Sequence, residues 1–264
     1  MEAELLKIGM TKIERDQPAY SSHSRLDRFG RKTMLYVTGD THGHVERFKD
    51  KTLLDDSTWV SEDKLIICGD FGFVFAADHN QSFQHQQEQE LDFLEQKPYS
   101  ILFIDGNHEN HDYLDSLPVE ERYAGNVHRI RNNIFHLMRG QVFNIDGITI
   151  FTMGGAYSID KSYRTEGISW WSRELPSPSE YKEAAANLKR TGNQADYIIS
   201  HTAPQNLIRL MGYQPDPHDM ELTGFLDWIW HDIKFKHWYF GHWHQDQKIH
   251  PKATACWFNV HTLE

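Results

Sequence analysis

Asp, Asn and His residues that could bind metals recur in five short clusters, and a glycine opens four of them. The clusters are Gly39-Asp40-Thr41-His42, Gly69-Asp70, Gly106-Asn107-His108-Glu109, Ser200-His201 and Gly241-His242-Trp243-His244. Carboxylate, amide and imidazole groups are hard or borderline ligands, and a mixed set of them suits divalent transition metals. Seven such ligands are enough for two ions, so these residues indicate metal-assisted chemistry.

Each cluster follows a run of apolar residues, and these runs indicate how the chain would position the clusters. The runs are 34–37, 65–68, 101–104, 197–199 and 237–240. An apolar run that ends in Gly-Asp or Gly-Asn is typical of a buried strand that stops and releases a polar side chain into a crevice. We therefore expect five such strands to end at one edge of a single sheet.

Stretches with other patterns separate these strands. Helices are predicted for Asn80–Gln96, for Ser179–Arg190 with Ser179 as its N-cap, and for a segment capped by Thr223. Residues 141–153 have the pattern of a hairpin around Asp146-Gly147, which is a strong turn signal. Alternating strands and helices followed by hairpins predict an α/β fold with a mixed central sheet and a second sheet packed against it.

The length and charge of the chain set limits on its organisation and its partners. Its 264 residues suffice for one large domain or for a core domain with additions. Residues 1–32 are polar and mixed in charge, which predicts a poorly ordered or peripheral extension before a folded domain over residues 33–264. The formal charge of −11 disfavours binding to duplex nucleic acid, which relies on clustered Lys and Arg. The pattern does not determine an oligomeric state.

Two further features bear on the cellular location. No apolar run approaches the ~20 residues of a membrane span, and the N-terminus lacks the apolar stretch of a signal peptide. Cys68 and Cys256 do not have CxxC spacing, so we interpret both as buried thiols in a reducing compartment. We therefore expect a cytoplasmic protein without a membrane partner.

The five clusters, in this order, resemble the calcineurin-like metallophosphoesterase superfamily, and the resemblance covers residues 34–261. It is greatest to the small, stand-alone bacterial or phage phosphoesterases. The resemblance implies a two-sheet α/β sandwich of mixed strands flanked by helices, with the metal site on loops at the strand ends. It also implies two divalent ions, of Mn, Fe, Zn or Ni, and a bridging hydroxide that attacks the phosphorus of a phosphoester.

The same resemblance implies a role for each cluster residue. The first ion would be bound by Asp40, His42 and His244, and the second by Asn107, His201 and His242, with Asp70 as the bridge. His108 would face the scissile phosphate and either donate a proton to the leaving oxygen or stabilise the transition state. Any one of these clusters alone would also be compatible with an ordinary turn or a lone zinc site. Their joint presence favours the metal centre.

The segment between Gly154 and Pro178 is the candidate for substrate selection. Its basic residues could hold phosphate and its aromatic residues could stack on a base, and the candidates are Tyr157, Arg164, Trp170 and Arg173. The alternative is a surface loop pinned by buried tryptophans, in which Arg173 pairs with an acid. Protein phosphatases of the superfamily carry an Arg shortly after the second cluster, whereas this chain has Phe73 and Val74 there.

These features predict a metal-dependent phosphohydrolase that acts on a small phosphorylated substrate, with a phosphodiester or a nucleotide favoured. A nuclease or an RNA- or DNA-end phosphatase is the alternative, which the acidic charge of the chain weakens. A non-catalytic scaffold with the same fold is a third hypothesis. Such scaffolds typically lose ligands or the catalytic histidine, and this chain keeps all seven ligands and His108.

Overall fold

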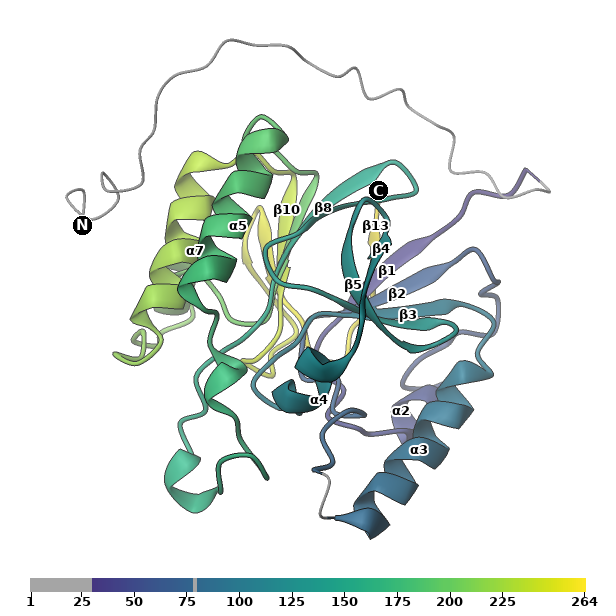
Figure 1. The fold of residues 1–264 in the computed structure, drawn as a ribbon. Helices are drawn as coiled ribbons and strands as arrows, with labels where there is room; N and C mark the ends of the chain where they lie inside the picture. The colour runs from purple at the N-terminus through teal and green to yellow at the C-terminus, as the bar shows by residue number, and fades with distance from the viewer. Residues whose placement is uncertain (1–29, 78–79) are drawn as a thin grey trace.

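Two β-sheets lie face to face, and helices cover their outer faces (Figure 1). The computed structural model describes residues 30–77 and 80–264, so the prediction for residues 1–32 lies almost wholly outside the described residues. The predicted α/β sandwich of mixed strands flanked by helices is confirmed. Among the described residues, no helix is both long enough and apolar enough to cross a membrane.

The first sheet has seven strands, four of which run parallel at its centre. In spatial order they are β13 (His261–Leu263), β1 (Leu35–Thr38), β2 (Lys64–Ile67), β3 (Ser100–Phe103), β6 (Ile134–Leu137), β5 (Gly125–Arg131) and β4 (Val119–Arg122). The pairs from β1 to β6 are parallel, and the outer pairs are antiparallel. The helices in this half of the chain are α2 (Glu46–Lys49), α3 (Gln81–Glu95) and α4 (His111–Ser116). α3 lies in the crossover that the parallel pair β2 and β3 requires.

The second sheet has six strands and repeats this plan. In spatial order they are β11 (Gln247–His250), β12 (Ala253–Ala255), β10 (His237–Phe240), β9 (Tyr197–Ser200), β8 (Ile148–Met153) and β7 (Val142–Ile145). The four central strands are parallel. Its helices are α5 (Pro178–Arg190), α6 (Gln205–Leu210) and α7 (Met220–Asp232). Two short 3-10 helices, η1 (Lys161–Tyr163) and η2 (Ser172–Glu174), lie in the segment that follows β8.

The five strands that precede the candidate ligands do not share one sheet, so that prediction was wrong. β1, β2 and β3 lie in the first sheet, whereas β9 and β10 lie in the second. A parallel strand covered on both faces has the same apolar pattern in either sheet, so the pattern could not tell the two sheets apart. The ligand loops meet where the carboxyl edges of the two sheets come together.

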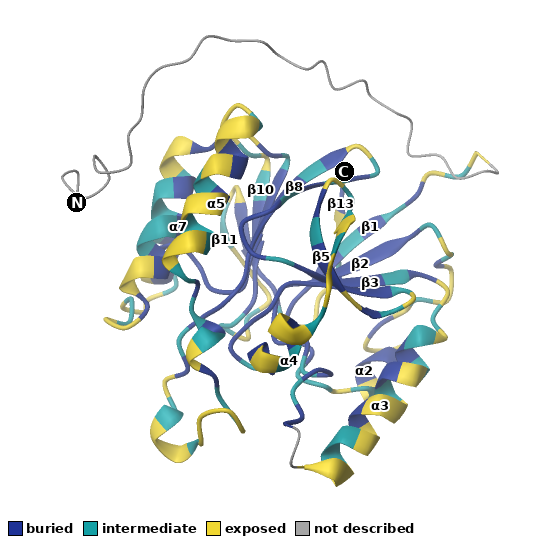
Figure 2. Cartoon of the chain, viewed as in Figure 1, coloured by how far each residue is buried: buried dark blue, intermediate teal, exposed yellow. Residues whose placement is uncertain are grey.

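Three apolar cores hold the layers in place. The central core joins the two sheets and includes Ile66 and Leu102 from the first sheet and Ile199 from the second. The outer cores bury Leu91 of α3 against the first sheet and Leu226 of α7 against the second. Each fully buried aliphatic side chain stabilises the fold by about 1.5–3 kcal/mol. Figure 2 shows the result, with buried strands between helices whose outer faces are exposed.

The predicted helix Asn80–Gln96 is confirmed, but α5 begins two residues earlier than predicted. Asn80 is the N-cap of α3. In α5 the N-cap is Ser177 rather than Ser179, because the Ser177 hydroxyl accepts from the Glu180 amide while the Glu180 carboxylate accepts from the Ser177 amide. This capping box, with Pro178 at the first helical position, is a stronger indication of the helix start than Ser179 alone.

The prediction of Thr223 as a helix cap was also wrong, whereas the hairpin is confirmed. α7 begins at Met220, and the Thr223 hydroxyl donates to the Asp219 carbonyl at 2.9 Å from inside the helix. β7 and β8 form the predicted hairpin. Asp146 and Gly147 have φ values of 53° and 82°, and the favoured two-residue hairpin turn needs positive φ at both positions.

Candidate metal centre

The five predicted clusters come together at the carboxyl ends of five parallel strands. Asp40, Asp70 and Asn107 follow β1, β2 and β3, while His201 and His242 follow β9 and β10. In open α/β sheets the crevice outside the carboxyl ends of the strands is the usual place for a ligand. The topology therefore places side chains from two sheets at one location.

Glycines beside the clusters are needed because side chains from other clusters occupy the adjacent space. A Cβ atom at Gly69 would overlap the His201 ring, and one at Gly106 would overlap the Asp70 carboxylate. Only a residue without a side chain lets these loops approach so closely. The repeated glycine in the sequence motif thus follows from contacts between distant parts of the chain.

Four predicted ligands have a backbone conformation that residues other than glycine rarely adopt. The φ angles of His42, Asp70, His242 and His244 are 48°, 46°, 65° and 48°. Such left-handed conformations cost of order 1–3 kcal/mol each and concentrate at functional sites. The strain indicates that the direction of these side chains matters more than local backbone stability.

Asp40, His42 and His244 form one group whose ligand atoms are close enough together to hold an ion. His42 Nε2 lies 2.8 Å from His244 Nε2, and His244 Nε2 lies 3.2 Å from Asp40 Oδ2. Two imidazole nitrogens at this distance can share no more than one proton. A cation between the three side chains would accept a lone pair from one ligand atom of each, so the donor set fits a divalent metal.

Asp40, Asp70 and His201 form a second group, which is fully buried. His201 Nδ1 lies 2.8 Å from the carbonyl oxygen of Cys68, to which it can donate. Its Nε2 then faces Asp70 Oδ1 at 3.3 Å and Asn107 Oδ1 at 3.1 Å. A histidine whose other nitrogen donates to a carbonyl is fixed in the tautomer and orientation that metal binding requires.

The Asp70 carboxylate faces both groups. Its Oδ1 lies 3.3 Å from His201 Nε2, and its Oδ2 lies 3.7 Å from His42 Nε2. Burial alone would raise the pKa of Asp70, but His201, His108 and His42 together outweigh burial and hold that pKa well below its usual range. A buried carboxylate that stays ionised needs compensating positive charge.

The pKa values of two imidazoles of the cluster shift in opposite directions. Burial would lower the pKa of His201, but Asp70 outweighs burial and raises it to about 10. Burial lowers the pKa of His242 to about 4. In the absence of metal, a proton on His201 therefore supplies charge that the carboxylates need, and a divalent ion would displace that proton.

Asn107 and His242 lie beside the second group. The His242 ring is 5.0 Å from the His201 ring, centroid to centroid, and the His242 backbone N–H donates to both oxygens of Asp40 at 3.0 and 2.9 Å. The metal-competent group itself joins His201 with Asp70 and Asp40. Asp40 therefore belongs to both groups, whereas the sequence assigned it to the first ion alone, and neither group includes His242.

His108 lies at the rim of the cluster and contacts Arg164. Its ring is 5.2 Å from the His42 ring, and its backbone N–H donates to Asp70 Oδ1 at 2.8 Å. Two guanidinium nitrogens of Arg164 lie 3.3 and 3.2 Å from the two ring nitrogens of His108, so the guanidinium spans the ring. Burial lowers the pKa of His108; Asp70 opposes this shift and Arg164 adds to it.

The other substrate candidates share the segment after β8 but contact different partners. Lys161 Nζ lies over the rings of Tyr157 and Trp170, at 4.0 and 4.5 Å from their centroids. Arg173 pairs with Asp115 at 3.0 Å and with an acid of α5, as the alternative interpretation expected. Within residues 30–77 and 80–264, none of the three candidates makes a hydrogen bond or ion pair with a predicted ligand.

Two residues beside the cluster were not identified from the sequence. Arg47 is buried and donates to the carbonyl oxygens of Asp40 at 2.8 Å and Trp257 at 2.6 Å. The Trp257 ring stacks on His244, with centroids 5.2 Å apart and planes 10° apart. Nothing in the local sequence distinguishes Arg47 from an exposed arginine on a short helix.

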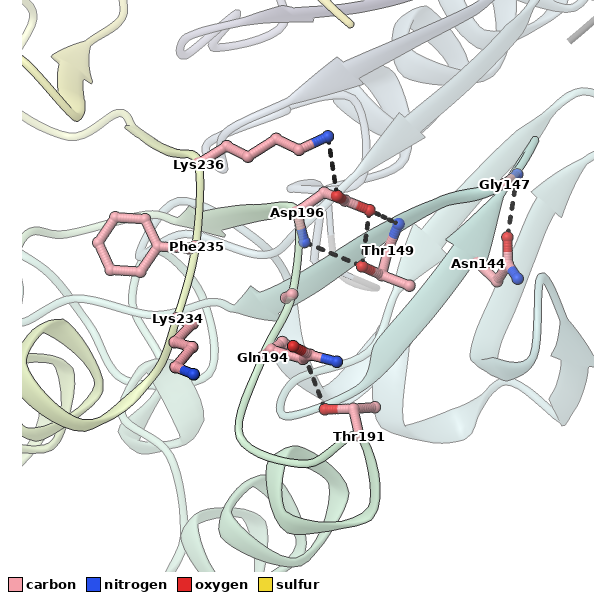
Figure 3. A pocket seen from close by; sticks show the side chains of 10 residues that line it. Asn144, Gly147, Thr149, Thr191, Gln194, Asp196, Lys234, Phe235 and Lys236 are labelled. Carbon is pink, nitrogen blue, oxygen red and sulfur yellow. Dashed lines mark hydrogen bonds and ion pairs between the residues drawn. The ribbon is translucent and has the colours of Figure 1, made fainter. Parts of the chain in front are cut away.

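A pocket at the amino ends of β8, β9 and β10 has a different character (Figure 3). Asp196 in this pocket accepts from the backbone and hydroxyl of Thr149, both at 2.8 Å, and pairs with Lys236 at 3.0 Å. Neither of the metal-competent groups found among the described residues lies here. The pocket therefore offers hydrogen-bonded polar groups and no convergent metal ligands.

Known proteins provide two comparisons. The sequence pattern of the family described as calcineurin-like phosphoesterase matches residues 34–246. A lariat debranching enzyme from Schizosaccharomyces pombe is 28% identical over 173 residues, which make up 60% of this chain and 34% of the relative. The chain therefore spans about a third of the length of the curated relative that it matches.

Proposed function

We propose that this chain, which belongs to the calcineurin-like phosphoesterase family, hydrolyses phosphoester bonds with divalent metals bound around Asp70. The observation that carries the proposal is the convergence of potential metal ligands. Oxygens of Asp70 and nitrogens of His42, His201 and His244 point toward one another from four loops. Asp70 and His201 are buried, and a buried carboxylate is costly unless a cation lies beside it.

We assign the metal ligands as follows. The proposed ligands of the first ion are Asp40, His42 and His244, and those of the second are Asn107, His201 and His242. Asp70 is the proposed bridge, since its two oxygens face His201 and His42. Two such ions would supply Lewis acidity toward phosphate oxygens and lower the pKa of a bound water. Manganese is the first ion to test, because mixed imidazole and carboxylate ligands suit Mn, Fe, Zn and Ni.

His108 is the proposed catalytic residue, which donates a proton to the leaving oxygen or stabilises charge in the transition state. It lies beside His42 at the rim of the cluster, where a bound phosphoester would project. Arg164 spans the His108 ring, and its Nε donates to Asp160 at 2.8 Å. Arg164 is therefore a candidate for holding a phosphate oxygen, with part of its charge already neutralised.

We favour a small phosphodiester or nucleotide as the substrate. A monoester brings two negative charges and a diester brings one, so a diester needs less compensating charge. Phe73 and Val74, at the place where protein phosphatases of the superfamily have an Arg, are buried apolar residues here. Arg164 shares its charge with Asp160. The proposed centre therefore depends mainly on its metals to bind phosphate.

A nuclease is the second candidate. The 28% identity to a lariat debranching enzyme favours it. The formal charge of −11 weighs against extended contact with a duplex, which needs clustered basic residues. A short or flexible strand held chiefly at the metals is compatible with both observations.

A cytoplasmic location is also part of the proposal. Cys68 and Cys256 are buried free thiols. Unpaired cysteines are typical of reducing compartments. Cell fractionation that recovered the protein in an oxidising compartment would contradict this location.

The test compares two chromogenic esters under one metal and one pH. Protein loaded with Mn²⁺ is expected to hydrolyse bis-p-nitrophenyl phosphate with a kcat/KM at least equal to that for p-nitrophenyl phosphate. A preference for the monoester of more than about tenfold, or roughly 1.4 kcal/mol, would overturn the diester assignment. If neither ester is hydrolysed with Mn, Ni, Zn or Mg, the proposed activity itself is wrong.

A pair of arginine variants tests the contribution of Arg164. Arg164→Ala removes the guanidinium beside His108. Arg129→Ala is the matched control, because Arg129 lies on β5 and pairs with Glu120 at 2.7 Å. We expect Arg164→Ala to lower kcat/KM for the monoester more than for the diester. Equal losses in both variants would show that total charge matters rather than this position.

A further inference from the structure

Ser158, in the segment after β8, contacts the predicted ligand Asn107. The Asn107 side-chain nitrogen donates to Ser158 Oγ at 3.1 Å, and both residues are buried. The other end of the amide, Oδ1, lies 3.1 Å from His201 Nε2. An amide has one donor end and one acceptor end. With the amide nitrogen bonded to Ser158, the oxygen is the end that faces His201 and the cluster.

Ser158 is itself held in place by Glu174. The Ser158 backbone N–H donates to Glu174 Oε1 at 2.9 Å, and Lys161 Nζ pairs with the same oxygen at 2.6 Å. Glu174 has no exposed surface, so Lys161 supplies the charge that a buried carboxylate needs. The Lys161 cation in turn lies over the rings of Tyr157 and Trp170.

The orientation of the Asn107 amide matters because its two ends act oppositely on a cation. Oδ1 is a ligand for a divalent ion, whereas the amide nitrogen would present two N–H donors and repel it. Ser158 and His201 each contact one end of the amide, so loss of the Ser158 hydroxyl removes one of the two contacts and leaves the buried nitrogen without the partner that it has here. Loss of a residue that orients a metal ligand typically weakens metal binding by roughly 10–100-fold.

We propose that Ser158 is a positioning residue that holds the Asn107 amide with its oxygen toward the second metal. Residues 154–174 would then set the affinity for the second ion, because Glu174 and Lys161 hold Ser158 in place. This inference rests on the proposed metal centre. It also gives Tyr157 and Trp170 a role in holding Lys161, in place of stacking on a substrate.

Calorimetric titration of metal-free protein with Mn²⁺ tests the inference without reference to activity. Ser158→Ala is expected to weaken binding of the second ion by roughly tenfold or more and to leave the first ion nearly unchanged. Ser169→Ala is the matched control, since the Ser169 hydroxyl accepts from the Thr165 amide at 3.0 Å in the same segment. This control loosens the tip of the segment without a contact to Asn107 and is expected to bind Mn²⁺ like the wild type.

A double-mutant cycle separates orientation of the amide from general support of the fold. Asn107→Asp presents an oxygen whichever way the side chain turns. In this background, Ser158→Ala is expected to change the affinity for the second ion by less than about twofold. A merely structural role for Ser158 would lower the affinity equally in both backgrounds, and thermal unfolding of each variant shows whether the fold is retained.

Three results would overturn the inference. One is unchanged Mn²⁺ affinity in Ser158→Ala, and another is an equal loss in Ser169→Ala. The third is a loss in the Asn107→Asp background as large as in the wild type. Wild-type protein that bound no divalent ion would instead overturn the proposed metal centre, and the inference with it. The titration therefore distinguishes failure of the inference from failure of the proposed function.

Discussion

A single strand, β2, carries a buried carboxylate at each end, and the two carboxylates have different surroundings. Asp63, before the strand, accepts from the backbone amides of Met34 at 2.9 Å and Val60 at 3.0 Å, and pairs with a guanidinium. Asp70, after the strand, accepts from one backbone amide and otherwise faces imidazole nitrogens, including that of His201 at 3.3 Å. Backbone and guanidinium donors satisfy Asp63, whereas Asp70 faces imidazoles that could share a proton or a metal ion with it.

Position along a strand does not by itself decide this difference. Asp105 also lies at a carboxyl end, after β3, yet the Arg139 guanidinium binds it through two nitrogens, and His136 contacts it at 3.2 Å. Burial would raise the pKa of Asp105, but Arg139 and His136 outweigh burial and hold it well below its usual range. The surrounding partners, rather than the end of the strand, separate structural acids from proposed metal ligands.

The largest expected effect follows from neutralising each acid of β2. Asp70→Asn is expected to lower metal content and kcat/KM together, with kcat/KM falling by roughly 10³-fold, because the metals supply several kcal/mol of transition-state stabilisation. Asp63→Asn is expected to cost about 1–3 kcal/mol of stability, the penalty for leaving buried donors poorly matched, with metal content retained. Elemental analysis and ester hydrolysis measure both. Equal loss of metal in the two variants would contradict the proposal that Asp70 binds metal and Asp63 does not.

His108→Ala sharpens the comparison within the carboxyl-end cluster. His108 touches Asp70 only through its backbone, so the metals are expected to stay bound in this variant. We expect kcat to fall by roughly 10²–10⁴-fold, the usual contribution of a positioned acid or base. Elemental analysis beside steady-state kinetics makes the measurement. If metal content falls as far as in Asp70→Asn, His108 has a different role.

Asp105→Asn tests whether partners outweigh position. The substitution leaves the buried Arg139 with only the more distant Glu180, at 3.8 Å, as a counter-charge, which is expected to lower the free energy of unfolding by about 3 kcal/mol. Asp196→Asn is the control, since Asp196 is only half-buried and its loss is expected to cost about 1 kcal/mol. Urea unfolding of the metal-free proteins measures both. A small change in Asp105→Asn, together with lost metal, would place Asp105 among the ligands instead.

The smallest expected effect concerns the pH dependence of stability and His237, the first residue of β10. Burial lowers the pKa of His237 to about 4, below the usual value of about 6.5. The neutral form is therefore favoured by folding, and its contribution to stability is present above pH ~6.5 and is lost as the pH falls toward ~4. His237→Gln is expected to flatten the loss of stability between these pH values in urea unfolding. An unchanged pH dependence would show that other groups dominate it.

His201 is expected to behave in the opposite way in the metal-free protein. Its pKa is raised to about 10 because Asp70 outweighs burial. Its contribution to stability is present below pH ~6.5 and is lost as the pH rises toward ~10. Titration of His201 and His237 by NMR, with and without metal, measures both pKa values directly. Added metal should displace the proton from His201 and leave the titration of His237 unchanged.

The sequence by itself determined the local features of this protein. Apolar runs marked β1, β2, β3, β9 and β10, because buried strands require apolar residues whatever surrounds them. The Asp146-Gly147 turn was predictable because its conformation depends on two adjacent residues. The family resemblance came from the order and spacing of five clusters, which are also local features. The family match over residues 34–246 agrees with it.

Only the tertiary structure decided which distant residues meet. It divided the five strands between two sheets and placed Arg164 against His108. It also placed Arg47 on the Asp40 carbonyl, a contact that no pattern of spacing reveals. An isolated charged or polar residue has the same local signature whether it is solvated or buried in a network. Its role follows from the surroundings that packing creates. The arrangement of imidazole nitrogens around the Asp70 carboxylate is therefore known only from the folded structure.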